Sequence, residues 1–224
     1  MQQEDRYKAT FEAYDKVASA YQDKFMDMDL YNDTYDLFCA LIQKQNATVF
    51  EIGCGPGNIT KYMLNKRPDF KVFGIDAAPK MIELAKANNP TADFEVMDCR
   101  TIDKVNSTFD GIVCGFCMPY LSKDDCCKLI KDCSKLLVGG GTLYFSAIEG
   151  DYEQSGYQSD SSGKIRMFIY YHEADHLLNQ LAINDFELVQ LARKSYPMPG
   201  GTSSIHSIFI ARKGSGTKIP LQPT

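Results

Sequence analysis

The feature that most constrains this chain is an apolar strand that runs into a glycine-rich turn and then a helical segment, Val49-Phe-Glu-Ile-Gly-Cys-Gly-Pro-Gly-Asn-Ile-Thr60. Glycines let the backbone bend sharply and approach a ligand closely, and the free amides at a helix start favour a carboxylate or phosphate. The pattern is typical of a nucleotide-cofactor turn. Asn58 stands where a dinucleotide fingerprint has its third glycine, so the spacing favours G-x-G-x-G instead.

From Ala47 onward, short apolar runs alternate with helical patterns, which predicts βαβ units and a mostly parallel sheet. The expected strands are Thr48–Ile52, Lys71–Ile75, Asp93–Met97, Phe109–Cys114, Thr142–Ile148, Phe186–Leu191 and Ser204–Ala211. The expected helices are Ile59–Asn65, Lys80–Ala87, Lys123–Leu137, which Gly139-Gly140-Gly141 would stop, and Glu173–Leu181. We therefore expect an α/β fold, a Rossmann-like doubly wound sheet of about seven mostly parallel strands with helices on both faces.

The length of 224 residues fits one domain, which we place at residues 1–213. Tyr7 to Gln45 is expected to form two amphipathic helices, so residues 1–46 would be an N-terminal helical lid. Residues 47–148 would bind the cofactor and residues 149–213 the substrate. Within the latter, the polar stretch Glu149–Lys164 predicts an inserted loop or hairpin. Residues 214–224 are expected to be a loose tail.

Charge and apolar patterning narrow the class of partner. A formal net charge of -5 gives no general attraction to nucleic acid, and no apolar run resembles a signal peptide or a membrane span. We expect a cytoplasmic protein, monomeric or homodimeric, without membrane or nucleic-acid partners. The eight cysteines are expected to be mostly reduced and buried; a redox or zinc pair at Cys114 and Cys117 is the alternative.

His172-Glu-Ala-Asp-His176 matches the zinc-hydrolase pattern H-E-x-x-H, in which two histidines one helical turn apart bind the metal. No third ligand is evident downstream. The favoured interpretation is an amphipathic crossover helix that packs its leucines against the sheet, with no metal site. A zinc hydrolase using His172, Glu173 and His176 stays as the less favoured alternative.

With E-x-G-C-G-x-G at Glu51 to Gly57, the chain resembles the class I S-adenosylmethionine-dependent methyltransferases, in their broad group of small-molecule enzymes. The resemblance extends from about Tyr14 to Lys213. It implies that S-adenosyl-L-methionine is the cofactor and S-adenosyl-L-homocysteine the product. The cofactor-contacting positions that it implies are Tyr14, Tyr21, Glu51, Gly53, Cys54, Gly55, Gly57, Asp76, Ala77, Met81, Asp98, Cys99, Cys114, Gly115 and Phe116.

The resemblance assigns roles to several of these residues. Glu51 would lie near the amino group of the cofactor, Asp76 would accept both ribose hydroxyls, and Asp98 would bind the adenine edge. Ala77 and Met81 would flank the adenine. The loop after the fourth expected strand would border the transferred methyl, and the Tyr14 and Tyr21 rings would face the sulfonium.

One departure bears on the acceptor. Methyltransferases that act on amides or base amines often carry an Asn- or Asp-Pro-Pro-Tyr turn, whereas this chain has Cys117-Met-Pro-Tyr120. A small-molecule acceptor is therefore favoured. Methyl transfer from a sulfonium requires no universal catalytic residue, but His172, His206 and Tyr21 are candidates for a base. The alternative function is a non-catalytic protein that only binds the cofactor.

The expected acceptor pocket is bounded by the N-terminal helices, the Cys114–Tyr120 loop, the Glu149–Lys164 insertion and the Ser195–Ser203 turn. Candidate lining residues are Tyr152, Tyr157, Arg166 and Tyr170.

Overall fold

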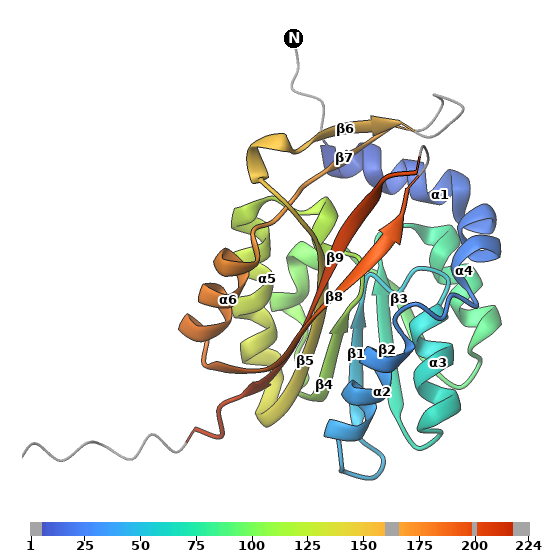
Figure 1. Cartoon of the computed structure of the whole chain (residues 1–224). Coiled ribbons are helices and arrows are strands. Elements are labelled where there is room, and N and C mark those ends of the chain that lie inside the picture. The colour runs from blue at the N-terminus through green and yellow to red at the C-terminus, as the bar shows by residue number, and fades with distance from the viewer. Residues whose placement is uncertain (1–5, 160–165, 199–200, 217–224) are drawn as a thin grey trace, which may run out of the picture.

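The computed structural model describes residues 6–159, 166–198 and 201–216 (Figure 1). Its central sheet has seven strands in the order β3-β2-β1-β4-β5-β9-β8. Strands β1 to β5 pair in parallel, whereas β9 is antiparallel to both β5 and β8. The strands are β1 Thr48–Ile52, β2 Lys71–Asp76, β3 Asp93–Val96, β4 Phe109–Cys114, β5 Leu137–Glu149, β8 Phe186–Pro197 and β9 Ser203–Lys213. The predicted Rossmann-like α/β fold of seven mostly parallel strands is confirmed.

Helices cover both faces of this sheet (Figure 1). Side chains from α5 and α6 pack in one cluster with Phe50 and Ile112, while α2 and α3 pack in another with Val49 and Val113. Neighbouring strand residues belong to opposite clusters because successive side chains of a strand point to opposite faces. The helices are α1 Arg6–Phe25, α2 Asn32–Leu41, α3 Asn58–Lys66, α4 Pro79–Asn88, α5 Lys123–Leu136 and α6 Ala174–Ile183. Among the described residues, no helix is long and apolar enough to span a membrane.

The two N-terminal helices have different positions. α1 lies over the edge of the sheet where β1, β2 and β4 end, as a lid should. α2 packs instead on a sheet face, where Phe38 and Tyr35 are buried and contact Tyr144 of β5. Only the first helix therefore covers the carboxyl ends of the strands.

The end of α5 differs from the prediction. The helix ends at Leu136, and Leu137 already has extended backbone and pairs with Phe109 of β4. Gly139, Gly140 and Gly141 lie inside β5, where the register with β4 is irregular. The triple glycine thus allows a bulge in a strand, and the prediction that it follows the helix as a separate stop is wrong. At its other end, α5 has an N-cap, because the Ser122 hydroxyl accepts a hydrogen bond from the Asp125 amide.

The polar insertion forms a hairpin at one end of the sheet. After a short 3-10 helix at Tyr152–Gln154, β6 Gly156–Ser159 pairs antiparallel with β7 Arg166–Ile169. Residues 160–165 lie outside the described structure, as do residues 217–224 of the expected tail. The hairpin rises beside α1 (Figure 1), so the two segments that sequence reasoning placed near the substrate lie side by side.

Candidate cofactor and acceptor site

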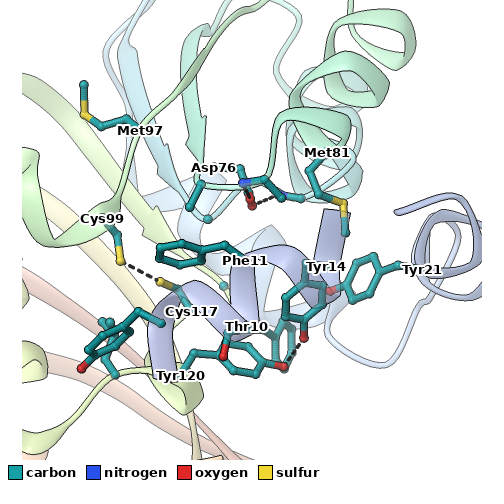
Figure 2. A pocket seen from close by; sticks show the side chains of 18 residues that line it. Thr10, Phe11, Tyr14, Tyr21, Asp76, Met81, Met97, Cys99, Cys117 and Tyr120 are labelled. Atoms are coloured by element: carbon teal, nitrogen blue, oxygen red, sulfur yellow. Dashed lines mark hydrogen bonds between the residues drawn. The ribbon is translucent and has the colours of Figure 1, made fainter. Parts of the chain in front are cut away.

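A cavity of about 90 Å³ lies between α1 and the carboxyl ends of β1, β2 and β4 (Figure 2). We call it the cofactor cavity. It is lined by Tyr7, Thr10, Phe11, Tyr14, Tyr21, Gly53, Gly55, Asp76, Ala77, Ala78, Met81, Met97, Cys99, Gly115, Phe116, Cys117, Tyr120 and Leu121.

The glycine turn forms one wall of this cavity. Gly53, Gly55 and Gly57 have φ of 68°, 53° and 82°, in the left-handed region that only glycine adopts readily. Gly53 and Gly55 line the cavity, but Gly57 does not. A Cβ at Gly57 would lie 2.3 Å from Nδ2 of the buried Asn89, which donates to the Gly57 carbonyl. Gly57 is therefore needed for close packing of the turn against α4.

Asp76 ends β2 and points its carboxylate at the cavity (Figure 2). It accepts hydrogen bonds from the amides of Gly55 and Ala78, both at 2.9 Å. Burial raises its pKa, although these backbone amides pull in the opposite direction. The next residues, Ala77 and Met81, also line the cavity. The carboxylate is held rigidly by the turn and keeps further lone pairs for a ligand.

Glu51 lies behind the glycine turn. Its side chain is 1% exposed and does not line the cavity. The Thr60 hydroxyl of α3 donates to Oε2, while Oε1 has no hydrogen-bond partner. Burial raises the pKa of Glu51 to about 8. Cys54 is also set back, packed with Ile82 and Phe94. A cofactor contact by either side chain stays a prediction.

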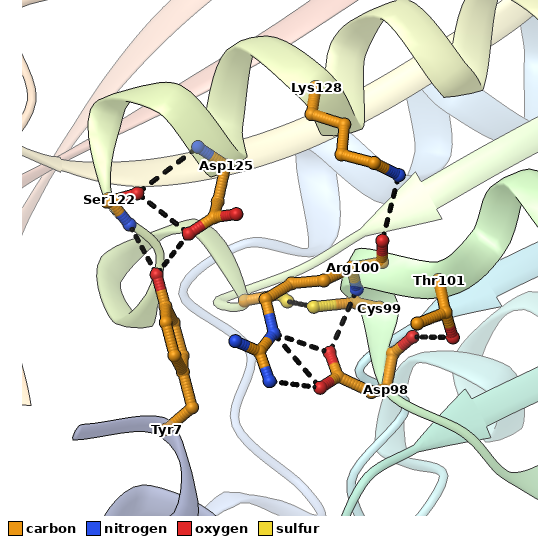
Figure 3. Close-up of polar contacts among 9 residues, drawn as sticks. Tyr7, Asp98, Cys99, Arg100, Thr101, Ser122, Asp125 and Lys128 are labelled. Atoms are coloured by element: carbon orange, nitrogen blue, oxygen red, sulfur yellow. Dashed lines mark hydrogen bonds and ion pairs between the residues drawn. The ribbon is translucent and has the colours of Figure 1, made fainter. Parts of the chain in front are cut away.

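Asp98 is engaged in an ion pair (Figure 3). The Arg100 guanidinium lies 2.5 Å from its carboxylate, and the Arg100 amide donates to it at 2.9 Å. Burial alone would raise the pKa of Asp98, but the bonds and charge of Arg100 outweigh it and lower the pKa. The cavity wall beside it is formed by Met97 and Cys99. The predicted contact between Asp98 and the adenine would therefore require the backbone next to Asp98 or a different side-chain orientation.

Two cysteines meet at the cavity wall. The Cys99 and Cys117 sulfurs are 3.5 Å apart (Figure 2), and both thiols are free. The hydrogen bond between Cys99 and Cys117, followed by burial, raises the pKa of the Cys99 thiol. Cys114 is buried behind this wall and does not line the cavity, whereas Gly115 and Phe116 do. The redox state of these cysteines stays a prediction.

Tyrosines of α1 close the cavity from above. The Tyr14 and Tyr120 hydroxyls are hydrogen-bonded to each other (Figure 2), and the Tyr14 and Tyr21 rings meet edge to face at 5.6 Å. At the other end of α1, the Tyr7 hydroxyl donates to Asp125 of α5 (Figure 3). The Arg100 guanidinium lies 3.9 Å from the Tyr7 ring centre. These contacts hold α1 against the body of the domain.

A second, larger cavity of about 510 Å³ adjoins the first; we call it the acceptor cavity. The two share four lining residues, Tyr14, Tyr21, Phe116 and Tyr120. Phe116 has φ of 59°, rare for a non-glycine residue, and its amide donates to the Ser146 hydroxyl at 2.8 Å. That strained backbone turns the Phe116 side chain to the boundary between the cavities.

Of the three catalytic candidates, Tyr21 and His206 line the acceptor cavity. His206 Nδ1 is 2.8 Å from the Tyr31 hydroxyl, and Nε2 is 3.1 Å from the Ser204 hydroxyl. Burial lowers the pKa of His206 to about 4. The third candidate, His172, is 1% exposed and lines neither cavity, because its Nε2 faces the Met118 carbonyl at 3.1 Å.

The hairpin presents the opposite face from the predicted one. Gln158, Ser159, Met167, Ile169 and Tyr171 line the acceptor cavity. The candidate lining residues Tyr152, Tyr157, Arg166 and Tyr170 do not; for example, Arg166 stacks on Tyr157 and Tyr170 binds Arg6 of α1. In a hairpin, a shift of one residue exchanges the two faces, so the error follows from alternation. The Ser195–Ser203 turn contributes Tyr196, Pro197 and Met198, while residues 199–200 lie outside the described structure.

The H-E-x-x-H segment does not form a two-histidine helix face. α6 begins at Ala174, so His172 precedes the helix. His172 approaches the Cys126 sulfur at 3.6 Å, His176 approaches the Cys127 sulfur at 3.5 Å, and Glu173 pairs with Lys123. Across the described ranges, no three His, Cys, Asp or Glu side chains are grouped to hold a metal ion. This geometry does not support the zinc-hydrolase alternative.

Several cavity residues were missed by sequence reasoning. They are Tyr7, Thr10, Phe11, Ala78, Met97, Cys117, Tyr120 and Leu121. Helical periodicity could have predicted Tyr7, Thr10 and Phe11, because they lie on the same face of α1 as Tyr14 and Tyr21. Cys117 and Tyr120 lie in the Cys114–Tyr120 loop, which was expected to bound the acceptor pocket but was not assigned to the cofactor cavity.

Comparison with known proteins agrees with this geometry. A methyltransferase-domain model matches residues 49–141. A carboxy-S-adenosyl-L-methionine synthase of Campylobacter jejuni is 28% identical over 145 residues, 62% of this chain and of that protein. A tRNA N(3)-methylcytidine methyltransferase of Schizosaccharomyces pombe is 23% identical, covering 68% of this chain and 65% of the other. This chain covers only 35% to 65% of the length of the curated relatives that it matches.

A solved structure shares the fold over nearly the whole chain. The magnesium protoporphyrin IX methyltransferase of Synechocystis, with bound S-adenosylmethionine, superposes with a TM-score of 0.71 at 14% identity and covers 96% of this chain and 100% of that one. The strand order, the glycine turn and the matched domain model all indicate the same methyltransferase fold. Residues 49–141 thus match a methyltransferase domain, and the chain as a whole has the fold of a solved methyltransferase that binds S-adenosylmethionine.

Proposed function

We propose that this protein transfers a methyl group from S-adenosylmethionine, bound in the cofactor cavity, to a small molecule in the acceptor cavity. The observation that carries the proposal is the wall that the two cavities share, formed by Tyr14, Tyr21, Phe116 and Tyr120. A donor and an acceptor on either side of it would meet there. A protein that only binds the cofactor has no need of a second cavity at this place.

The residues of the cofactor cavity suit this ligand. Asp76 would accept the ribose hydroxyls, and the apolar Ala77, Met81 and Met97 would flank the adenine. The glycine turn leaves room for the amino-acid end. Around a sulfonium, the rings of Tyr14, Tyr21 and Tyr120 would supply cation–π attraction.

The bound cofactor would supply a methyl group already activated on a positive sulfur. The acceptor lone pair forms the new bond to carbon, the carbon–sulfur bond breaks with its electrons left on sulfur, and the acceptor proton leaves. The protein therefore has to align the acceptor and exclude water. Burial under α1 and the aromatic wall serve both purposes.

His206 is the polar group best placed to orient the acceptor. It is neutral at physiological pH because burial lowers its pKa to about 4, so it accepts a hydrogen bond rather than carrying charge. The proton on the acceptor atom becomes strongly acidic as the methyl bond forms. The hydroxyls of Ser204 and Tyr31, which are hydrogen-bonded to His206, would carry that proton towards the imidazole. Burial raises the pKa of Tyr21, which therefore stays protonated and acts through its ring and hydroxyl.

Thermal unfolding with ligand tests the cofactor site. S-adenosylhomocysteine at ~100 times its dissociation constant should stabilise the fold by ~2.7 kcal/mol, whereas NAD and zinc should not. Asp76→Ala should abolish the rise in midpoint, and Asp93→Ala, at an exposed position on the neighbouring strand, should keep it. A rise with NAD or zinc alone would overturn the proposal. Methyl transfer to bulk RNA, rather than to small molecules, would overturn the acceptor class.

A further inference from the structure

The acceptor cavity is rich in aromatic rings and carries formal charge at one place. Of its 24 lining residues, nine are Tyr or Phe. No Asp or Glu is among the described lining residues, and Lys24 is their one Lys or Arg. Aromatic walls favour a flat, polarisable ligand, and a cationic ligand would find no carboxylate here to form an ion pair.

Lys24 stands in the last turn of α1 at the edge of the cavity. Its ammonium lies 4.9 Å from the Phe25 ring centre and 6.0 Å from that of Tyr196. Within the described part of the chain, no carboxylate comes within ion-pair distance of it. Its charge is thus available to an anionic group that enters between these rings.

Tyr196 connects this cation to the reacting end of the cavity. Its ring stacks on His206 with centres 4.9 Å apart and planes 9° apart, and His206 lies 5.5 Å from Phe116 at the shared wall. The His206 ring centre is 4.9 Å from that of Tyr196, which is 6.0 Å from the Lys24 ammonium. The His206 ring and the Lys24 ammonium are therefore at most about 11 Å apart. One ring system with a short acidic arm fits that span.

Resting on the methyl transfer proposed above, we propose that the acceptor is a flat aromatic small molecule that carries an anionic group. Its ring lies against Tyr196, its anion faces Lys24, and the oxygen or nitrogen that receives the methyl faces Phe116 and His206. Lys24 is then a specificity-determining residue, which selects anionic over neutral and cationic aromatics.

Four probes that differ in charge or in aromaticity test this with the full chain saturated with S-adenosylhomocysteine. They are para-hydroxyphenylpropionate, para-cresol, tyramine and cyclohexylpropionate, compared by calorimetry. We expect the tightest binding for the aromatic anion. Lys24→Met should weaken it about fivefold, as expected for one partly exposed ion pair of ~1 kcal/mol, and leave para-cresol unchanged. Lys16→Met, on the same helix at an exposed position outside both cavities, should change neither.

The possible results separate the two proposals. If S-adenosylhomocysteine itself does not bind, the proposed function fails. If it binds, but tyramine or cyclohexylpropionate binds as well as the aromatic anion, the acceptor class is wrong. Equal losses in Lys24→Met and Lys16→Met, or no loss in either, would refute the role of Lys24. An unfolding midpoint like that of the wild type shows that Lys24→Met remains folded.

Discussion

Replacing Glu51 by Gln should stabilise the fold, and increasingly so as the pH rises. The Glu51 carboxyl is 1% exposed, its Oε1 has no partner, and burial raises its pKa to about 8 from an ordinary 4.5. Below pH 4.5, the carboxyl is protonated in both the folded and the unfolded chain. Between pH 4.5 and 8 the unfolded chain ionises and the folded one does not, so the free energy of unfolding falls by about 1.4 kcal/mol per pH unit. The penalty is complete above pH 8.

Chemical denaturation at pH 5.0 and 8.5 measures this effect. Glutamine keeps an acceptor for the Thr60 hydroxyl but cannot ionise. The advantage of Glu51→Gln over the wild type should grow by about 4 kcal/mol between the two pH values, as an upper limit because local relaxation lets water in. Glu95→Gln, at an exposed position, controls for the loss of a carboxylate. An advantage of the same size at both pH values would refute the reasoning.

Two further substitutions probe the turn and the acceptor cavity. Gly57→Ala should lower the free energy of unfolding by about 3 kcal/mol, because it adds a clash with Asn89 to the strain of positive φ. Gly140→Ala, also at positive φ but with nothing within 4 Å, should cost only about 1 kcal/mol in urea titrations; equal losses would exclude the clash. His206→Asn should lower kcat by about tenfold or more at pH 7.5. In the wild type, kcat should show no loss from His206 protonation until the pH approaches 4; an acid limb near 6.5 that His206→Asn removes would contradict the lowered pKa.

The parts that sequence predicted well are those set by local order along the chain. Gly53, Gly55 and Asp76 were found because a strand end, a glycine turn and the next strand end follow one another at short spacing. The alternation of strands and helices along the chain also predicted the sheet, and the bounds of β1 and β4 are those predicted.

The remainder depended on contacts between distant segments. Asp98 belongs to the right strand exit, but its orientation is set by Arg100, which pattern alone does not reveal. His172 and His206 were indistinguishable as candidates until packing placed one behind the Met118 carbonyl and the other in a cavity. Neighbouring residues of a strand point to opposite faces, so a shift of one residue decides which side chains of the hairpin face the cavity. Amino-acid composition does not reveal that shift.

Helix α1 contributes Tyr14 and Tyr21 to the walls of both cavities. A single rigid element therefore has to be in place for either ligand to be enclosed. Whatever conformational freedom α1 loses when one cavity is filled does not have to be lost again when the second is filled. If α1 loses this freedom on binding of the proposed ligands, the two binding events would be coupled with positive cooperativity, and thermodynamic linkage would require each ligand to raise the affinity for the other by the same factor.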